Sequence, residues 1–395
     1  MSEMEEKLKE YCTVMSGYAF NSKDLSEGAD IPVIKIGNIS NGKNVIIDDT
    51  TQYVNKKFLS IDKKYHIKNG DILISLTGSH INQSNSMVGR CCRNLNNTVY
   101  LLNQRAGKII PKKTVNKNFL YYVFRLKSIQ YAIANRAYGG ANQVNVSPKD
   151  VMSIKFKIPD ITIQNKIADI LSAYDNLIEN NNKRIKLLEQ MAENLYKEWF
   201  VRFRFPGYED VEFVDGMPEG WKICRIDQLS KIKAGGDAPD DSTKEITDEC
   251  SIPIYSNGIE NEGLYGYTSK AKINNPSITI SARGTVGYTC LRRVSYTPIV
   301  RLICIIPHEE KLANWLFYYF KRTLVIANGT SQQQITIPMM GREKVLLPTN
   351  DLIQKFYEYS TCYLDEIDIL KAQNSNLEKQ RDLLLPRLMS GKLKV

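Results

Sequence analysis

The sequence predicts an α+β protein with two strand-rich modules, each followed by one long helix. Three observations support this prediction: the chain repeats itself, each copy ends in a long heptad pattern, and short alternating runs precede that pattern. An internal repeat indicates that the two halves fold alike, here with a pseudo-two-fold relation. We expect the two long helices to pair with each other as an antiparallel coiled coil.

The two long helices are the clearest elements. The segment from Pro159 to Phe200 aligns without a gap on a segment 189 residues later, so that Pro159 falls on Pro348. Apolar residues recur in steps of three and four, with one extra step of four at the same place in both copies, which indicates a heptad seam with one stutter. Each copy spans some 36 residues, or about 55 Å of helix. The seam residues that we expect to pair are Ile167, Tyr174, Ile178, Leu188, Leu195, Phe356, Tyr363, Ile367, Leu377 and Leu384.

Polar residues interrupt this seam at Asn181, Asn374 and Arg381. A buried Asn fixes the register and the number of partners at a cost in stability, whereas the alternative is that these positions are wetted by solvent. Pro386 is expected to kink or end the second helix, because proline cannot donate the backbone hydrogen bond.

The two modules also correspond to each other, although more loosely than the helices. Alternating runs at residues 71–75 and 277–281 predict short strands, and residues 120–125 and 315–321 predict one helix in each module. Residues 45–47 are also expected to form a strand. The predicted boundaries are residues 1–157 for the first module, 158–202 for the first helix, 203–346 for the second module and 347–395 for the second helix.

Composition and charge favour a folded protein with a polyanionic partner. The chain has 395 residues, 43% of them hydrophobic, and a net charge of +10. Residues 1–155 hold 22 Lys/Arg against 12 Asp/Glu, and residues 265–347 hold 11 against 3. Basic surfaces with nearby aromatic residues fit phosphate neutralisation, although a generic basic protein is the alternative. We expect no membrane span and a cytoplasmic location.

No catalytic or cofactor motif stands out. The eight cysteines include no C-x-x-C pair and there are only three histidines, so we predict neither a metal site nor a cofactor bound by this chain. Residues 37–43 match G-x4-G-K, but Asn44 follows where a P-loop has Ser or Thr. Asp240, Asp241 and Glu245 permit a metal-dependent nuclease as an alternative, yet a solvated acidic loop is the simpler interpretation.

Loops that follow the predicted strands carry the candidate DNA contacts. Arginine can bind guanine edges or phosphates, and Asn and Gln can bind adenine through two hydrogen bonds. Arg301, close behind the candidate arginines of the second module, could make the same kind of contact. Glycine-rich loops with amide side chains occur in both copies, near residues 138–143 and 328–334. The candidate DNA-binding residues are Ser79, His80, Asn82, Gln83, Asn142, Gln143, Arg283, Thr285, Arg292, Arg293, Ser331, Gln332, Gln333 and Gln334.

The whole chain resembles the specificity subunits of type I restriction-modification systems. The resemblance rests on Ser-Gly-Tyr-Ala-Phe at 16–20, Ile-Gly-Asn-Ile at 36–39, Pro-Glu-Gly-Trp at 218–221 and the ending Leu-Met-Ser-Gly-Lys-Leu at 388–393, in that order. Ile158-Pro159 leading to Gln164, and Trp199-Phe200 leading to Phe205-Pro206, belong to the same set. The first module lacks the Pro-Glu-Gly-Trp entry of the second.

The resemblance implies a non-catalytic subunit with two target-recognition domains. Each domain would read one half of a bipartite site in double-stranded DNA, and the helix pair would set the gap between the halves. It implies two modification (methyltransferase) subunits and restriction (endonuclease and translocase) subunits as partners, with S-adenosylmethionine, ATP and Mg²⁺ bound by those partners. Methylation of adenine requires the base to leave the duplex. The alternative is a coiled-coil adaptor that assembles partner proteins without reading DNA.

Overall fold

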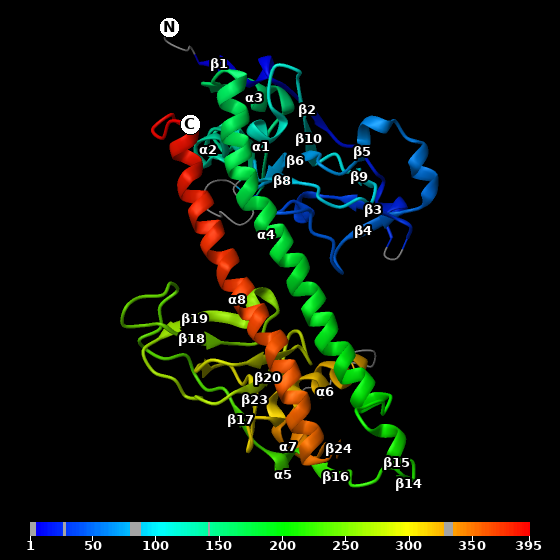
Figure 1. Ribbon diagram of the computed structural model, residues 1–395. Helices are drawn as coiled ribbons and strands as arrows, with labels where there is room; N and C mark the ends of the chain where they lie inside the picture. The colour runs from blue at the N-terminus through cyan, green and yellow to red at the C-terminus, as the bar shows by residue number, and fades with distance from the viewer. Residues whose placement is uncertain (1–4, 27–28, 80–87, 141–142, 328–334) are drawn as a thin grey trace. The chain divides into compact units, whose positions relative to one another are not determined.

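A computed structural model describes residues 5–26, 29–79, 88–140, 143–327 and 335–395, which fall into two compact units. Unit 1 comprises residues 1–180 and 374–395, and unit 2 comprises residues 181–373. The two long helices, α4 (Ile161–Tyr196) and α8 (Asn350–Met389), contribute to both units (Figure 1). We call the strand-rich part of unit 1 before α4 module 1, and the part of unit 2 between α4 and α8 module 2.

Module 1 is built on an antiparallel sheet with the strand order β2-β10-β6-β8. These strands are β2 (Cys12–Ser16), β10 (Ala106–Pro111), β6 (Ile72–Ser75) and β8 (Cys91–Arg93). All four residues of β6 are buried, because Ile72 and Ile74 pack in one apolar cluster and Leu73 packs in another. Successive side chains of a strand point to opposite faces, so β6 is covered on both sides. The strand predicted at residues 71–75 is therefore confirmed, but with both faces buried.

Further sheets complete module 1. A second four-stranded sheet has the order β4-β3-β9-β5, with β3 and β9 parallel, and a three-stranded sheet has the order β11-β12-β7. The strands are β4 (Gln52–Val54), β3 (Ile31–Ile34), β9 (Tyr100–Leu102), β5 (His66–Ile67), β11 (Tyr138–Gly140), β12 (Gln143–Asn145) and β7 (Thr77–Gly78), with β1 (Glu6–Lys7) paired to β13 (Lys155–Phe156). The prediction of a strand at residues 45–47 is wrong. The Asn38 side chain binds the carbonyl of Ile46 at 2.9 Å, and this contact holds the segment as a loop.

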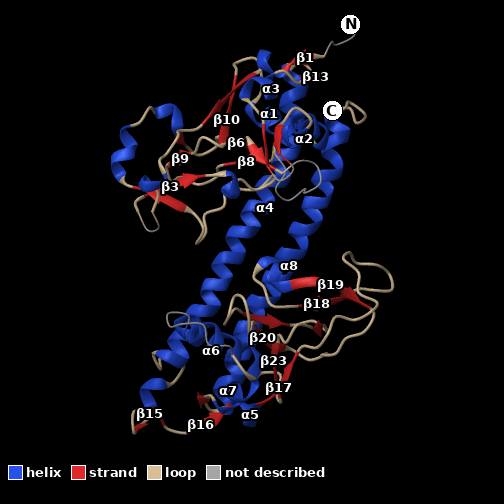
Figure 2. Cartoon of the chain, turned by 180° about the vertical axis from the view of Figure 1, so that it is seen from behind, coloured by secondary structure: helices blue, strands red, loops and turns tan. Residues whose placement is uncertain are grey.

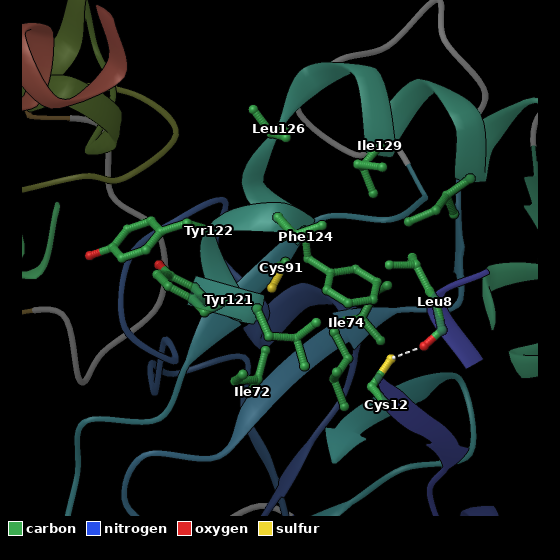
Figure 3. Packing of buried hydrophobic residues seen from close by; sticks show 14 of the residues in the cluster. Leu8, Cys12, Ile72, Ile74, Cys91, Tyr121, Tyr122, Phe124, Leu126 and Ile129 are labelled. Atoms are coloured by element: carbon green, nitrogen blue, oxygen red, sulfur yellow. Dashed lines mark hydrogen bonds between the residues drawn. The ribbon is translucent and has the colours of Figure 1, made fainter. Parts of the chain in front are cut away.

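Three helices cover one face of the main sheet of module 1. They are α1 (Lys117–Arg125), α2 (Lys127–Ala134) and α3 (Pro148–Met152), and α1 confirms the helix predicted at residues 120–125. The Asn116 side chain accepts hydrogen bonds from the backbone N–H groups of residues 118 and 119 and so caps α1. Aromatic residues of α1 pack in the same cluster as Ile72 and Ile74 of β6 (Figure 3). This packing fixes β6 beneath α1.

Module 2 repeats the strand order of module 1. Its main sheet has the order β17-β23-β20-β21, and its second sheet, β19-β18-β22, again contains a parallel pair, β18 with β22. The strands are β17 (Ser230–Ala234), β23 (Ile303–Pro307), β20 (Ser277–Ile280), β21 (Thr289–Arg292), β19 (Leu264–Thr268), β18 (Ile252–Tyr255) and β22 (Thr297–Pro298). The loose internal repeat of the sequence therefore corresponds to a repeated topology.

The remaining elements of module 2 are helices and short strands, which Figure 2 shows with this core. The helix predicted at residues 315–321 is confirmed within α6 (Leu312–Ala327). The other elements are β14 (Phe213–Val214), β15 (Met217–Pro218), β16 (Lys222–Arg225), β24 (Lys344–Leu347), α5 (Ile226–Leu229) and α7 (Ile337–Arg342).

Helices α4 and α8 pack together in each unit. In unit 1, Leu171 of α4 and Leu388 of α8 lie in the same apolar cluster, and in unit 2 Tyr196 and Phe356 do so. The helices are antiparallel, because the partner position in α8 falls as the position in α4 rises: residue 181 bonds residue 373, and residue 184 pairs with residue 366. Beyond α4 a π-helical turn, Lys197–Val201, buries Trp199 and Phe200.

The expected seam faces the interior along most of its length. Asn181, Asn374 and Arg381 are all buried, which decides against the solvent-wetted alternative. Near the stutter of the second copy, Tyr359 is 55% exposed and Ser360 is buried in its place. The seam residues are buried at Ile167, Ile178, Phe356 and Ile367, and partly buried at Tyr174, Leu188, Leu195, Tyr363, Leu377 and Leu384.

Of the two outcomes expected at Pro386, a kink or an end of the helix, the structure excludes the end, because α8 continues to Met389. A proline at this position removes the backbone hydrogen bond to the carbonyl of Asp382, four residues earlier. Asp382 is exposed, so water can satisfy that carbonyl. The last turn of the helix therefore tolerates the proline.

Candidate nucleic-acid interface

Strand β6 of module 1 ends between two arginines. The backbone N–H of Ser75 donates to the carbonyl of Arg90 at 2.9 Å, and the N–H of Leu76 donates to the carbonyl of Arg105 at 3.0 Å. These bonds bring two turns that are distant in sequence to the same strand end. Arg105 is exposed and Arg90 is partly buried.

Lys35 completes this basic cluster, which we define as Lys35, Arg90 and Arg105. Burial, and secondly the positive charge of Arg105, lower the pKa of Lys35, so these two cations lie near each other. The Arg90 guanidinium donates to the carbonyl of Ile36 at 3.3 Å, next to Lys35. Positive charges clustered in this way create a positive potential that attracts anions.

The three-stranded sheet of module 1 follows β6 closely in the chain, because its strand β7 begins two residues after β6 ends. Strand β12 pairs with β7, and the hydroxyl of Thr77 donates to the Asn145 side chain at 2.7 Å. Gln143, a candidate from the sequence, is exposed on β12, whereas Ser79 is buried. Tyr138 on the neighbouring strand β11 is 62% exposed. Amide and aromatic side chains are thus exposed to solvent on the strands that share a sheet with β7.

In module 2 the equivalent strand, β20, is followed by the loop of residues 281–287. Arg283 and Thr285, both candidates from the sequence, are exposed in this loop. Asn257 connects the loop to a second turn: its side-chain oxygen accepts from Ala282 N at 2.9 Å, and its Nδ2 donates to Val300 O at 2.7 Å. The second turn carries Arg301, which is exposed.

Arg105 and Arg301 occupy equivalent places in the two modules. In each turn a backbone N–H closes the turn on the carbonyl three residues earlier, from residue 106 to 103 and from residue 302 to 299. In each module a glycine N–H also donates to a backbone carbonyl of the turn. Gly17 donates to the carbonyl of residue 106, and Gly235 donates to the carbonyl of residue 302. A Cβ on Gly17 would lie 2.3 Å from a carbonyl oxygen, and one on Gly235 would lie 2.6 Å from a backbone nitrogen. Sequence reasoning named Arg301 as an arginine that could bind phosphates or guanine edges, but it did not name Arg105.

Two of the candidate arginines have structural partners. Arg292 is 3% exposed, its Nε donates to the hydroxyl of Thr279 at 2.9 Å, and its guanidinium stacks 3.6 Å from the ring centre of Tyr255. Arg293 pairs with Asp365 and Asp368 of α8, the latter at 2.6 Å. We therefore attribute the contacts of both arginines to the packing of unit 2.

Eight candidates lie outside the described residues, so the structure gives no account of them. They are His80, Asn82, Gln83, Asn142, Ser331, Gln332, Gln333 and Gln334. The structure does describe residues of module 1 that flank two of the undescribed segments: residue 79 follows β7, and residue 143 begins β12.

An ion cluster anchors module 1 to the helices within unit 1. The carboxylate of Asp175 on α4 accepts from Arg381 of α8 at 2.8 Å, from Arg93 of β8 at 2.9 Å and from the hydroxyl of Tyr122 on α1 at 2.6 Å. Arg125 of α1 lies 3.9 Å away. One carboxylate therefore joins the sheet and helix α1 of the module to α4 and α8.

The structure describes the two loops on which the nuclease and nucleotide-binding alternatives depend. No group of three metal-ligating side chains occurs among the described residues, and none of the helices described has the length and apolar character needed to cross a membrane. Asp241 accepts hydrogen bonds from Thr268 and from the backbone and hydroxyl of Ser269, which lower its pKa to about 2. The segment of residues 37–43 begins within a 3-10 turn, Ile36–Asn38, and no helix follows it as a P-loop requires.

Comparison with known proteins gives a consistent result. The family model for the type I restriction modification DNA specificity domain matches residues 1–190 and 218–379. The chain is 26% identical to the type I restriction enzyme MjaIX specificity subunit of Methanocaldococcus jannaschii, over 99% of this chain and 93% of that one. It is 25% identical to the HindI specificity subunit of Haemophilus influenzae, over 89% and 94%. The crystal structure of a type I restriction-modification S subunit from M. genitalium has a similar fold, with a TM-score of 0.59 and 15% identity over 98% of this chain and 95% of that one.

Proposed function

The chain belongs to the type I restriction-modification DNA specificity family, and from this premise we propose that each of its two modules reads one half of a bipartite site in double-stranded DNA. As a DNA specificity subunit it is a non-catalytic component of the complex. Its part in the reaction is to bind DNA and to direct the enzymatic subunits to one sequence.

This proposal rests on one observation: the turn that contains Arg105 in module 1 recurs in module 2 as the turn that contains Arg301. Arg105 and Arg301 are presented by the same hydrogen-bond pattern at the same strand end of two modules whose surrounding loops differ. A shared framework can hold both modules against the DNA in the same way, while the different loops around it let each module read a different half-site. Two such modules on one chain suit a site with two unlike halves.

We assign the DNA contacts to the loops at these strand ends. In module 1 the proposed contacts are Gln143, Arg105 and the segment that contains His80, Asn82 and Gln83. In module 2 they are Arg283, Thr285 and Arg301. We further propose Asn142 and residues 331–334 as contacts, and we leave out Arg292 and Arg293 because of their partners inside unit 2.

Helices α4 and α8 are the elements to which we assign partner subunits. We propose that two modification subunits bind along them and that restriction subunits join the assembly. On this view residues 158–202 and 347–395 serve as spacers between recognition domains at 1–157 and 203–346. S-adenosylmethionine, ATP and Mg²⁺ would then belong to the partner subunits, and the complex would act on DNA in the cytoplasm.

The salt dependence of DNA binding tests the proposal. We would assemble the chain with its modification subunits and measure fluorescence anisotropy with duplex DNA over a series of KCl concentrations. Each phosphate contact contributes roughly 0.9 to the slope of log affinity against log salt. Arg105→Ala and Arg301→Ala should each lower the affinity, and Lys155→Ala, at an exposed position on β13, serves as the control. A complex that assembles but shows no salt-dependent DNA binding would favour the protein-only adaptor.

A further inference from the structure

The turn that carries Arg301 has a strained backbone. Val300 and Arg301 have φ angles of 52° and 59°, in the left-handed region. This region is unfavourable for a β-branched residue such as valine, and such conformations cluster at functional sites where the surrounding structure holds them. Gln104 and Arg105, at the equivalent turn of module 1, are described and have no positive φ.

Several hydrogen bonds hold the strained turn in place. Val300 N donates to Gly236 O at 2.8 Å, and Arg301 N donates to Gly235 O at 2.9 Å. From the other side, Asn257 Nδ2 donates to Val300 O at 2.7 Å, while the Oδ1 of the same side chain accepts from Ala282 N. The turn is thereby fixed both to the two glycines that follow strand β17 and to the loop of residues 281–287.

The result is an arginine on a rigid support. Arg301 is exposed, and Asn257 sets its backbone beside the loop that presents Arg283 and Thr285. A long side chain on a mobile loop is enough to hold a phosphate, because phosphates lie along the whole DNA backbone. A base edge is a single target, and a guanidinium that binds guanine O6 and N7 through two hydrogen bonds needs a fixed approach.

We infer that the turn at Val300–Arg301 is a preorganised base-reading element of module 2, with Arg301 as a specificity-determining residue and Asn257 as its positioning residue. The inference rests on the proposed function, because it identifies which element of module 2 reads its half-site. Guanine is the base that the guanidinium of Arg301 recognises. The left-handed strain at Val300 is maintained because it fixes the direction from which Arg301 approaches.

The test is the methylated motif itself. Cells would express the modification subunit with wild-type chain or with Arg301→Ala, Asn257→Ala or Val300→Gly, and single-molecule sequencing would report methyladenine in their DNA. With Arg301→Ala we expect one position in one half-site to lose its preference for guanine by roughly 5- to 150-fold, the range for a bidentate pair. The other half-site and the gap should not change.

The Val300→Gly variant distinguishes a role of the turn in positioning Arg301 from a role in stabilising the fold. Glycine adopts the left-handed region without strain, so the thermal midpoint should be equal to or above that of the wild type. The preference at the same position should nevertheless weaken, which a purely structural role would not produce. Val294→Gly, at an exposed position outside the turn, is the matched control and should leave the motif unchanged.

Two results would overturn the inference. The first is methylation of the same motif with unchanged preference in cells that express Arg301→Ala, and the second is an equal fall in DNA affinity for all sequences, as expected for a phosphate contact. A wild-type chain that directs no motif would instead show that the proposed function fails, and the inference would fail with it.

Discussion

Replacement of Asp175 by alanine should strongly destabilise unit 1. The Asp175 side chain is 12% exposed, and those of Arg381 and Arg125 are 6% and 8% exposed. Removal of the carboxylate leaves these guanidiniums with the carboxylate of Asp382, which is 56% exposed, as the remaining acidic partner among the described residues. Breaking a buried ion pair in this way costs about 3–5 kcal/mol.

The expected loss can be measured directly. For a unit of this size, a loss of that magnitude lowers the midpoint of thermal unfolding by on the order of 10 °C. Hydrogen exchange should locate the effect, because α1 loses the contacts of Tyr122 and Arg125 with Asp175 and should exchange faster. Asp175→Asn, which keeps an acceptor oxygen for Tyr122, should be less damaging than Asp175→Ala.

The control is an exposed ion pair between the same two helices. Arg184 and Glu366 pair at 2.6 Å with side chains that are 52% and 37% exposed, so Glu366→Ala should cost less than about 1 kcal/mol. If Asp175→Ala lost no more free energy of unfolding than Glu366→Ala, the reasoning about the buried cluster would be refuted.

Three further predictions concern packing, partner number and cysteine reactivity. Gly17→Ala should cost more than about 2 kcal/mol in denaturant unfolding because its Cβ would meet backbone, whereas Gly37→Ala, with open space around it, should cost at most about 1 kcal/mol for its backbone change. Asn181→Leu should raise the unfolding midpoint but broaden the distribution of oligomers in sedimentation analysis, and a single unchanged species would contradict a register role. Exposed Cys362 should react with maleimide under native conditions well before the buried cysteines, and equal rates would count against the buried assignment. Burial raises the pKa of the thiols to about 12 for Cys12 and Cys92 and to about 11 for Cys304.

The large elements of the fold could be predicted because they depend on periodicity. A seam in steps of three and four gives α4 and α8, and the repeat gives two modules with the same strand order. The path of residues 45–47 depends instead on hydrogen bonds with Asn38, through its side chain and its backbone carbonyl, that no local pattern encodes.

The candidate site was harder to predict than the fold, as the arginines show. Arg292 is buried because alternation along β21 puts it on the same inward face as Cys290, and this signal was present in the sequence. Arg105 was missed because its equivalence to Arg301 rests on backbone hydrogen bonds, while the side chains around the two arginines differ.

The most direct test of the central claim is single-molecule methylation sequencing of DNA from cells that express the modification subunit with and without this chain. We predict methyladenine at one split motif only when this chain is present, with one half altered by Arg105→Ala and the other by Arg301→Ala. Subunits that co-purify with this chain but produce no motif, or both variants altering the same half, would contradict the claim that each module reads one half-site.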